Sequence, residues 1–182
     1  MILYVVMGGV VLVLIYSLVI YNSLIKSNNT VKEAFATMDV YLKKRWDLIP
    51  NIVETVKGYA KHEKETLENV VKLRNTAYNN LSPDDKIKTN EILTQDVSRL
   101  MMLAENYPDL KANQVFLDLS SQLTKVEDDI AQSRKYYNAV VKNFNNKVQM
   151  FPSNLFANIF GYETKKMFEA DSSERASLKV EL

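Results

Sequence analysis

The sequence contains no cysteine, one histidine, four glycines and four prolines among its 182 residues. Without cysteine the chain cannot form a disulfide or a thiolate metal site. Because glycine and proline are scarce, turns are few, and a chain of this length with few turns consists of long helices. The net charge is only +1. The sequence therefore lacks the clustered cationic excess of nucleic-acid-binding proteins, and we expect no nucleic-acid partner.

The single histidine limits the possible chemistry. His62 and Glu63 begin the zinc-protease pattern H-E-x-x-H, but its fifth position is Thr66, so the second histidine ligand is missing. The many carboxylates do not form the Glu-x-x-His motifs of di-iron bundles. A Gly-rich phosphate loop is also missing. We therefore interpret the region around His62 as a solvated turn and predict a non-enzymatic protein without metal or cofactor.

The chain does contain one long apolar segment. Residues 1–25, "MILYVVMGGVVLVLIYSLVIYNSLI", carry no charged side chain, and 15 of them are Leu, Ile or Val. About 20 helical residues cross a hydrocarbon core of roughly 30 Å. A buried core helix of this length does not suit so small a domain, and the basic start and cleavage site of a signal peptide are missing. We predict a retained transmembrane anchor that includes Leu3, Val5, Val6, Val10, Val11, Leu12, Val13, Leu14, Ile15, Leu18, Val19 and Ile20.

The cationic residues near the anchor predict its orientation. Lys26 and Lys32 follow the anchor and Lys43, Lys44 and Arg45 come soon after, whereas only the α-amino group precedes it. The positive-inside rule then places the N-terminus outside the cell and the remaining chain in the cytoplasm of a single-pass membrane protein. A domain on the extracytoplasmic side is the alternative.

Beyond the anchor, apolar residues recur every three or four positions, which is the period of a helix. "TVKE" at 30–33 matches a capping box, so a helix either begins there or continues from the anchor. The pattern continues to about Asn79. In "NNLSPDD", Ser82 is the predicted N-cap and Pro83 the first residue of a shorter helix that runs to about Glu105.

The last long helix shows a coiled-coil-like seam with a mean spacing of about 3.5 residues. Pro152 ends this helix, Ser153 or Asn154 is the predicted cap of the short segment "LFANIF", and Gly161 suits its C-terminus. The seam consists of Phe116, Leu119, Leu123, Val126, Ile130, Ser133, Tyr137, Val140, Phe144, Val148 and Phe151.

These patterns predict an all-α fold: a transmembrane helix over 1–25, an elongated antiparallel bundle with long coiled-coil-like helices over 26–169, and a mobile tail over 170–182. The predicted helices after the anchor, roughly 70, 35 and 60 Å long, do not match in length. Either the first folds at Pro50, or its uncovered apolar seam packs on another copy. An exposed seam of that size exceeds what monomers usually tolerate, so we expect self-association.

Two segments are candidate contact surfaces. Pro50 removes the hydrogen bond that its N–H would make to the Trp46 carbonyl, which predicts a kink. The residues around it either shape the bundle or contact a partner or second subunit. "FPSNLFANIFGY" at 151–162 has too many apolar residues to stay free, so it docks on protein, as we expect, or on the membrane surface. The predicted contact residues are Arg45, Trp46, Asp47, Pro50, Asn51, Glu54, Phe151, Pro152, Asn154, Phe156 and Phe160.

From Tyr21 to Glu169 the chain resembles the LemA family. The resemblance rests on "DLIPN", "ENYPDLKAN" and "FPSN", in that order, and the chain departs from the family pattern mainly at Asn28 and Tyr162. The resemblance implies a bacterial membrane protein with a short extracytoplasmic N-terminus, one anchor and an antiparallel helical domain. It supplies no catalytic residues.

Two functions are consistent with these expectations. The first is a membrane-anchored helical scaffold that forms homo-oligomers and organises or shapes the bilayer. The second is a membrane-tethered adaptor that binds another membrane protein, such as a protease or an envelope-stress component, through the segment from Arg45 to Glu54.

Overall fold

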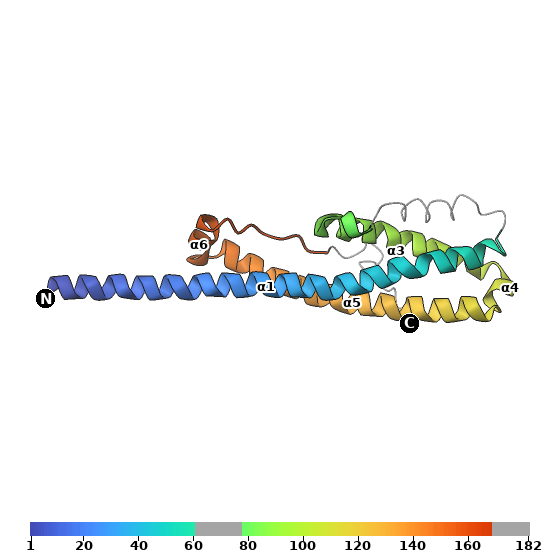
Figure 1. Ribbon diagram of the computed structural model, residues 1–182, viewed down its shortest axis with the longest axis horizontal. Coiled ribbons are helices and arrows are strands. Elements are labelled where there is room, and N and C mark those ends of the chain that lie inside the picture. The colour runs from blue at the N-terminus through green and yellow to red at the C-terminus, as the bar shows by residue number, and fades with distance from the viewer. Residues whose placement is uncertain (61–77, 169–182) are drawn as a thin grey trace, which may run out of the picture. The chain divides into compact units, whose positions relative to one another are not determined.

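The computed structural model describes residues 1–60 and 78–168, and within these ranges every regular element is a helix (Figure 1). The predicted all-α fold is therefore confirmed. The region around His62 and the predicted tail lie outside the described residues. The elements are α1 (Ile2–Lys57), the 3-10 helix η1 (Tyr78–Asn80), α3 (Pro83–Glu105), α4 (Pro108–Lys111), α5 (Gln114–Gln149) and α6 (Ser153–Ile159).

The chain divides into two compact units, which we describe separately. Unit 1 comprises Met1–Asn29 and Asn138–Leu182, and unit 2 comprises Thr30–Tyr137. Helices α1 and α5 contribute residues to both units, α3 and α4 belong to unit 2, and α6 belongs to unit 1.

Helix α1 is continuous through Asn28 and Asn29 and also through Pro50. Of the two possibilities at Thr30, the structure therefore shows continuation from the anchor. The helix ends at Lys57, so the predicted end near Asn79 was wrong. Gly58 follows directly, and glycine is a poor helix former because its backbone is so free. The apolar period alone could not reveal this end, because it continues through Ala60 into residues outside the described ranges.

The early end of α1 removes the expected mismatch in helix length. The part of α1 in unit 2 spans roughly 40 Å and α3 roughly 35 Å. The apolar face of this part of α1 is buried, so the prediction of a long uncovered seam on it was wrong. The buried residues are Val31, Ala34, Met38, Leu42, Trp46, Ile49, Ile52, Val53 and Val56.

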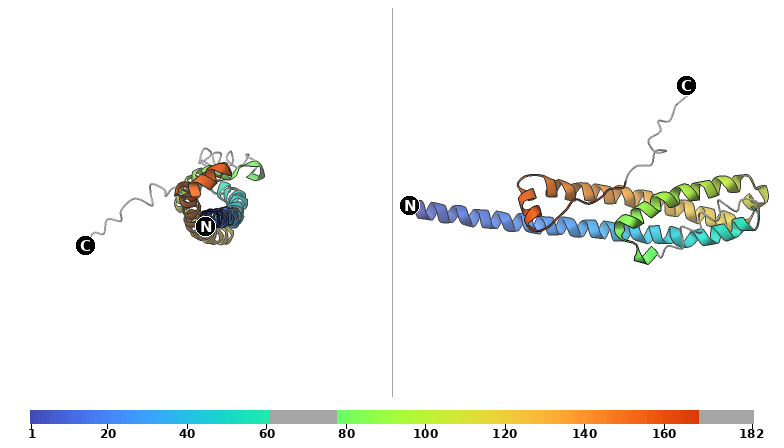
Figure 2. Two further views of the ribbon diagram at one scale, coloured as in Figure 1. Left: turned by 90° about the vertical axis from the view of Figure 1, so that its left-hand side faces the viewer. Right: turned by 90° about the horizontal axis from the view of Figure 1, so that it is seen from above.

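Contacts in unit 2 fix the directions of its helices (Figure 2). Helix α5 is antiparallel to α1, since Phe35 contacts Tyr137 with ring centroids 5.9 Å apart and Arg45 contacts Glu127. Helix α3 is parallel to α1, since Asp39 pairs with Lys86 and Arg45 bonds to Thr94. The predicted apolar faces of α3 and α5 supply the rest of the core: Ile87, Leu93, Val97, Leu100 and Ala104 from α3, and Phe116, Leu123, Val126 and Ile130 from α5.

The predicted start of α3 is confirmed. Ser82 is the N-cap, its hydroxyl accepts a 3.2 Å hydrogen bond from the Asp85 amide, and Pro83 occupies the first helical position. The predicted side-chain cap of α6 was wrong. Its N-cap position is Pro152, and the Ser153 hydroxyl instead donates to the Met150 carbonyl at 2.9 Å.

Gly161 ends α6 as predicted, with φ +68°. The Tyr162 amide donates to the Ala157 carbonyl at 2.8 Å, which closes the helix C-terminus in the manner of a Schellman motif. Glycine is favoured here because residues with a side chain rarely adopt this backbone conformation.

After Gly161 the chain runs back along α5, held by two asparagine side chains. The Asn145 side chain donates to the Lys165 carbonyl at 2.9 Å and accepts from the Lys165 amide at 2.8 Å. Asn138 makes the same pair of bonds to Phe168, both at 2.9 Å. Seven helical residues advance about 10.5 Å and three extended residues about 10 Å, so the two asparagines match the spacing of the returning chain.

Candidate functional site

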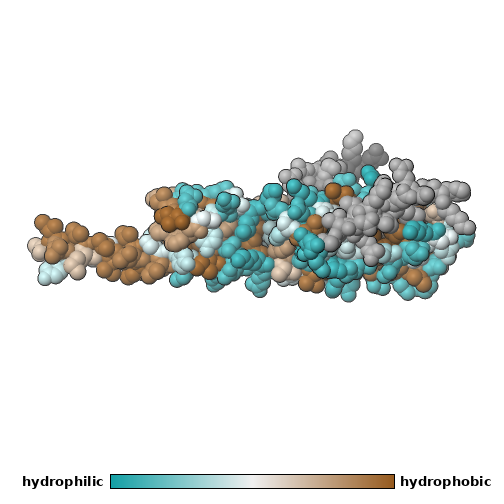
Figure 3. All heavy atoms as spheres, turned by 45° about the horizontal axis from the view of Figure 1, so that its top comes forward, coloured by the Kyte–Doolittle hydropathy of each residue, from teal (hydrophilic) through white to brown (hydrophobic). Residues whose placement is uncertain are grey.

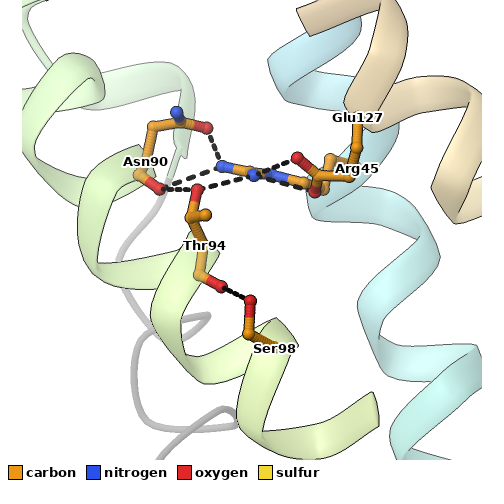
Figure 4. Close-up of polar contacts among 5 residues, drawn as sticks. All are labelled: Arg45, Asn90, Thr94, Ser98 and Glu127. Atoms are coloured by element: carbon orange, nitrogen blue, oxygen red, sulfur yellow. Dashed lines mark hydrogen bonds and ion pairs between the residues drawn. The ribbon is translucent and has the colours of Figure 1, made fainter. Parts of the chain in front are cut away.

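Arg45, the first residue of the predicted contact surface, lies inside unit 2 with no solvent exposure. Figure 4 shows its guanidinium between Asn90, Thr94 and Glu127. Arg45 lies between Leu42 and Ile49 on the apolar face of α1. One of its terminal nitrogens, Nη1, donates to Glu127 Oε1 at 2.8 Å and to Thr94 Oγ1 at 2.9 Å. The other, Nη2, donates to the backbone carbonyl of Asn90 at 3.0 Å and to its side-chain oxygen. The guanidinium therefore joins α1, α3 and α5.

The network around Arg45 leaves some polar atoms without a hydrogen bond. Arg45 Nε and Asn90 Nδ2 are buried and have no hydrogen-bond partner among the described residues. Glu127, by contrast, keeps a side-chain exposure of 33%. Burial of a charge is costly unless it is paired. The arrangement therefore serves to fix three helices in one register, and Arg45 is not available to an outside partner.

Trp46 is also buried, and its ring lies 5.3 Å from that of Tyr78. The Tyr78 hydroxyl donates to Asp39 Oδ1 at 2.5 Å, and Lys86 Nζ lies 2.7 Å from Asp39 Oδ2. Burial raises the pKa of Tyr78 above its usual value, and the hydrogen bond to Asp39 raises it further. For Arg45 and Trp46 the structure thus favours the interpretation that they shape the bundle, and the expectation that they form a contact surface was wrong.

Three other residues of the predicted surface are exposed. Asp47, Asn51 and Glu54 are spaced four and three residues apart, so they share one face of α1. Asp47 pairs with Lys43, and Glu54 lies 3.9 Å from Lys57. We call Asp47, Asn51 and Glu54 the polar strip. Pro50 is half-buried beside it.

In unit 1, α6 lies against α1. The Phe160 ring contacts Tyr21 with centroids 4.7 Å apart. A groove of about 440 Å³ lies between the two helices and is lined by Leu14, Ser17, Leu18, Tyr21, Phe156 and Phe160. The predicted contact residues Phe156 and Phe160 therefore pack on the apolar N-terminal part of α1.

The other predicted residues of this segment lie differently. Phe151 is 79% exposed and is not part of the buried seam of α5. Pro152 is half-buried, and Asn154 has a buried Oδ1 without a hydrogen-bond partner among the described residues. Within residues 1–60 and 78–168, no group of three or more His, Asp or Glu side chains is placed to hold a metal ion.

A family model described as "LemA family" matches residues 34–182. The chain belongs to the LemA family. A curated relative, Protein LemA of Metamycoplasma hominis, is 28% identical over 160 residues, which cover 86% of this chain and 72% of that protein. Magnetosome proteins MamQ 1 and MamQ 2 of Paramagnetospirillum magneticum are each 30% identical over 73 residues, which cover 40% of this chain and 27% of theirs.

LemA family membership and the properties of α1 fit a membrane-associated protein. Helix α1 is long and apolar enough to span a membrane, with a mean hydropathy of 2.6 in its most apolar window. None of that window is buried, whereas the core helix of a soluble protein hides its apolar side chains.

The partners of Arg45 were not predicted, although the sequence contained a signal for one of them. Asn90 occupies a core position between Ile87 and Leu93, where a polar residue indicates a buried hydrogen bond. Nothing in the period of α5 marked Glu127 as the residue that faces Arg45. Asn138 and Asn145, which we call the asparagine clamp, hold the returning chain against α5. They were not predicted, because the sequence did not indicate that the chain returns along α5.

Proposed function

We propose that this LemA family protein is a non-enzymatic, membrane-anchored helical scaffold whose copies associate at the bacterial membrane and thereby organise or shape it. The observation that carries the proposal is the continuity of α1. The helix that is apolar enough to span the membrane also supplies the buried face around which α3 and α5 pack in unit 2. The folded domain is therefore built directly on the anchor.

Two features support association between copies. Anchoring in one membrane confines the copies to two dimensions, which raises their effective concentration and lets weak contacts add up. The polar strip presents both charged and uncharged hydrogen-bonding groups on one exposed face of α1. Such a surface suits weak, reversible contacts better than the largely apolar interfaces of obligate dimers.

Sedimentation of the full-length protein in mild detergent at micromolar concentration tests this proposal. We expect particles that contain several copies, and a uniform monomer would overturn the scaffold. The double variant Asp47→Lys/Glu54→Lys reverses the charge of the polar strip and should lower the particle mass. Glu105→Lys, an exposed charge reversal at the end of α3, is the matched control and should leave the mass unchanged.

The second candidate function is an adaptor, and the exposure of the polar strip favours it as well. In that case the strip binds a different membrane protein, and the same charge reversal abolishes one specific cross-link while the mass of the purified particle stays the same. Sedimentation and cross-linking together therefore distinguish the scaffold from the adaptor.

A further inference from the structure

Helix α6 and the residues just before it form a second apolar surface beside the anchor. Residues 148–162 contain no charged side chain. On α6 the residues divide into two rows. Phe156 and Phe160 line the groove on α1, although Phe160 keeps an exposure of 49%, whereas Leu155 and Ile159 do not line it and are 52% and 74% exposed. Phe151, in the turn before α6, is 79% exposed and adds to this apolar surface.

The position of α6 along α1 determines how deep α6 lies in the membrane. Phe156 and Phe160 share a groove with Leu14, Leu18 and Tyr21. Leu14 and Leu18 precede Lys26, the first charged residue of the chain, by about 18 and 12 Å of helix. A lysine stays at the headgroup level, and the headgroup region is only about 5–7 Å deep on each side. Leu14 and Leu18 therefore lie within the hydrocarbon of a membrane that α1 spans, and α6 lies beside them.

The distribution of charged residues in unit 1 agrees with this depth of α6 in the membrane. The described residues of unit 1 contain five lysines (Lys26, Lys142, Lys147, Lys165 and Lys166) and one acidic residue, Glu163. The Lys147 ammonium contacts the Ser23 hydroxyl at 2.9 Å, which places it close to the level of Lys26 on α1. Cations at this level attract the anionic headgroups of a lipid leaflet.

We propose that α6 is an interfacial membrane-binding element. Phe151, Leu155 and Ile159 enter the hydrocarbon of the leaflet next to the anchor, and a lipid acyl chain fills the groove between α6 and α1. The occupant is the bilayer because these residues and the anchor both expose apolar side chains, and Figure 3 shows hydrophobic spheres at α6 close to those of the N-terminal part of α1. The lysines of unit 1 lie at the headgroups. This inference rests on membrane anchoring and does not require association between copies.

Site-specific spin labels test the inference. Because the chain has no cysteine, a nitroxide can be attached at Ile159→Cys or Leu155→Cys without removing a native thiol. The full-length protein is placed in vesicles of phosphatidylcholine and phosphatidylglycerol, and collisions of the label with oxygen and with a water-soluble nickel complex are compared. Leu12→Cys in the anchor and the exposed Val115→Cys in unit 2 are the references.

We expect the oxygen-to-nickel ratio at 155 and 159 to approach that of Leu12→Cys and to exceed that of Val115→Cys several-fold. Nickel access at 155 and 159 equal to that at Val115→Cys, with Leu12→Cys still shielded, would overturn the inference alone. Labels at 155 and 159 that are immobile and shielded from both reagents would also overturn it, because a protein then covers the row. Nickel access at Leu12→Cys would overturn the anchor itself.

Discussion

Arg45 Nη1 and Glu127 Oε1 lie 2.8 Å apart, although 82 positions separate these residues in the chain. The pair connects the buried face of α1 to α5, and Asn90 and Thr94 connect the same guanidinium to α3. A single buried cation therefore depends on the correct packing of α1, α3 and α5 in unit 2.

Glu127→Ala should lower the free energy of unfolding by about 3 kcal/mol, because it leaves a buried guanidinium without a counter-charge. The double variant Arg45→Met/Glu127→Leu should recover most of this loss, since it removes both charges. Denaturant unfolding followed by circular dichroism measures both effects. Asp128→Ala, at the exposed neighbouring position, is the control and should change the stability by less than about 0.5 kcal/mol. Equal effects of Glu127→Ala and Asp128→Ala would show that the pair does not hold the bundle.

The raised pKa of Tyr78 predicts that the protein loses stability at alkaline pH. Because this pKa is raised in the folded protein, the contribution of Tyr78 to the free energy of unfolding is fully present below the unfolded pKa of about 10. Above that pH the unfolded chain loses the tyrosine proton while the folded chain keeps it, and stability falls by about 1.4 kcal/mol per pH unit until the folded pKa is reached. The stability difference between wild type and Tyr78→Phe, measured at increasing pH, should shrink with this slope. A stability difference between the two proteins that stays constant from about pH 9 to about pH 11, on either side of the unfolded pKa, would contradict a raised pKa of Tyr78.

Asn145→Leu should release the returning segment from α5. The substitution removes two hydrogen bonds to the Lys165 backbone, together about 2 kcal/mol, or roughly 30-fold in local opening. Trypsin should then cut after Lys165 and Lys166 faster, as mass spectrometry can follow. Asn143→Leu is the control on the exposed side of the same helix. Similar cleavage rates in the two variants would mean that the asparagine clamp does not hold the segment.

The positive-inside rule predicts the orientation. Ser121→Cys on the exposed surface of α5 should react with a membrane-impermeant maleimide only after the cells are permeabilised. Reaction in intact cells would place the domain on the extracytoplasmic side, which is the alternative orientation.

The sequence predicted those features that local chemistry determines. Ser82 and Pro83 specify the start of α3, and Gly161 specifies the end of α6. The uncharged residues before Lys26 specify the helix that can span a membrane. Features that depend on distant residues were not predictable in the same way. The helical period continues past Lys57 regardless of where α1 ends, and the burial of Arg45 follows from partners on α3 and α5. The sequence showed that 151–162 must dock, but only the structure shows which row of α6 packs on α1.

Cross-linking in native membranes tests the scaffold most directly. Asn51→Cys places the only thiol of the chain in the polar strip, and Ser121→Cys, on a different exposed surface, is the control. A bis-maleimide should join Asn51→Cys copies into products of twice the chain mass and more, with far less product from Ser121→Cys. Efficient labelling of Asn51→Cys without any product between copies, or with a product that contains only a different protein, would contradict the scaffold.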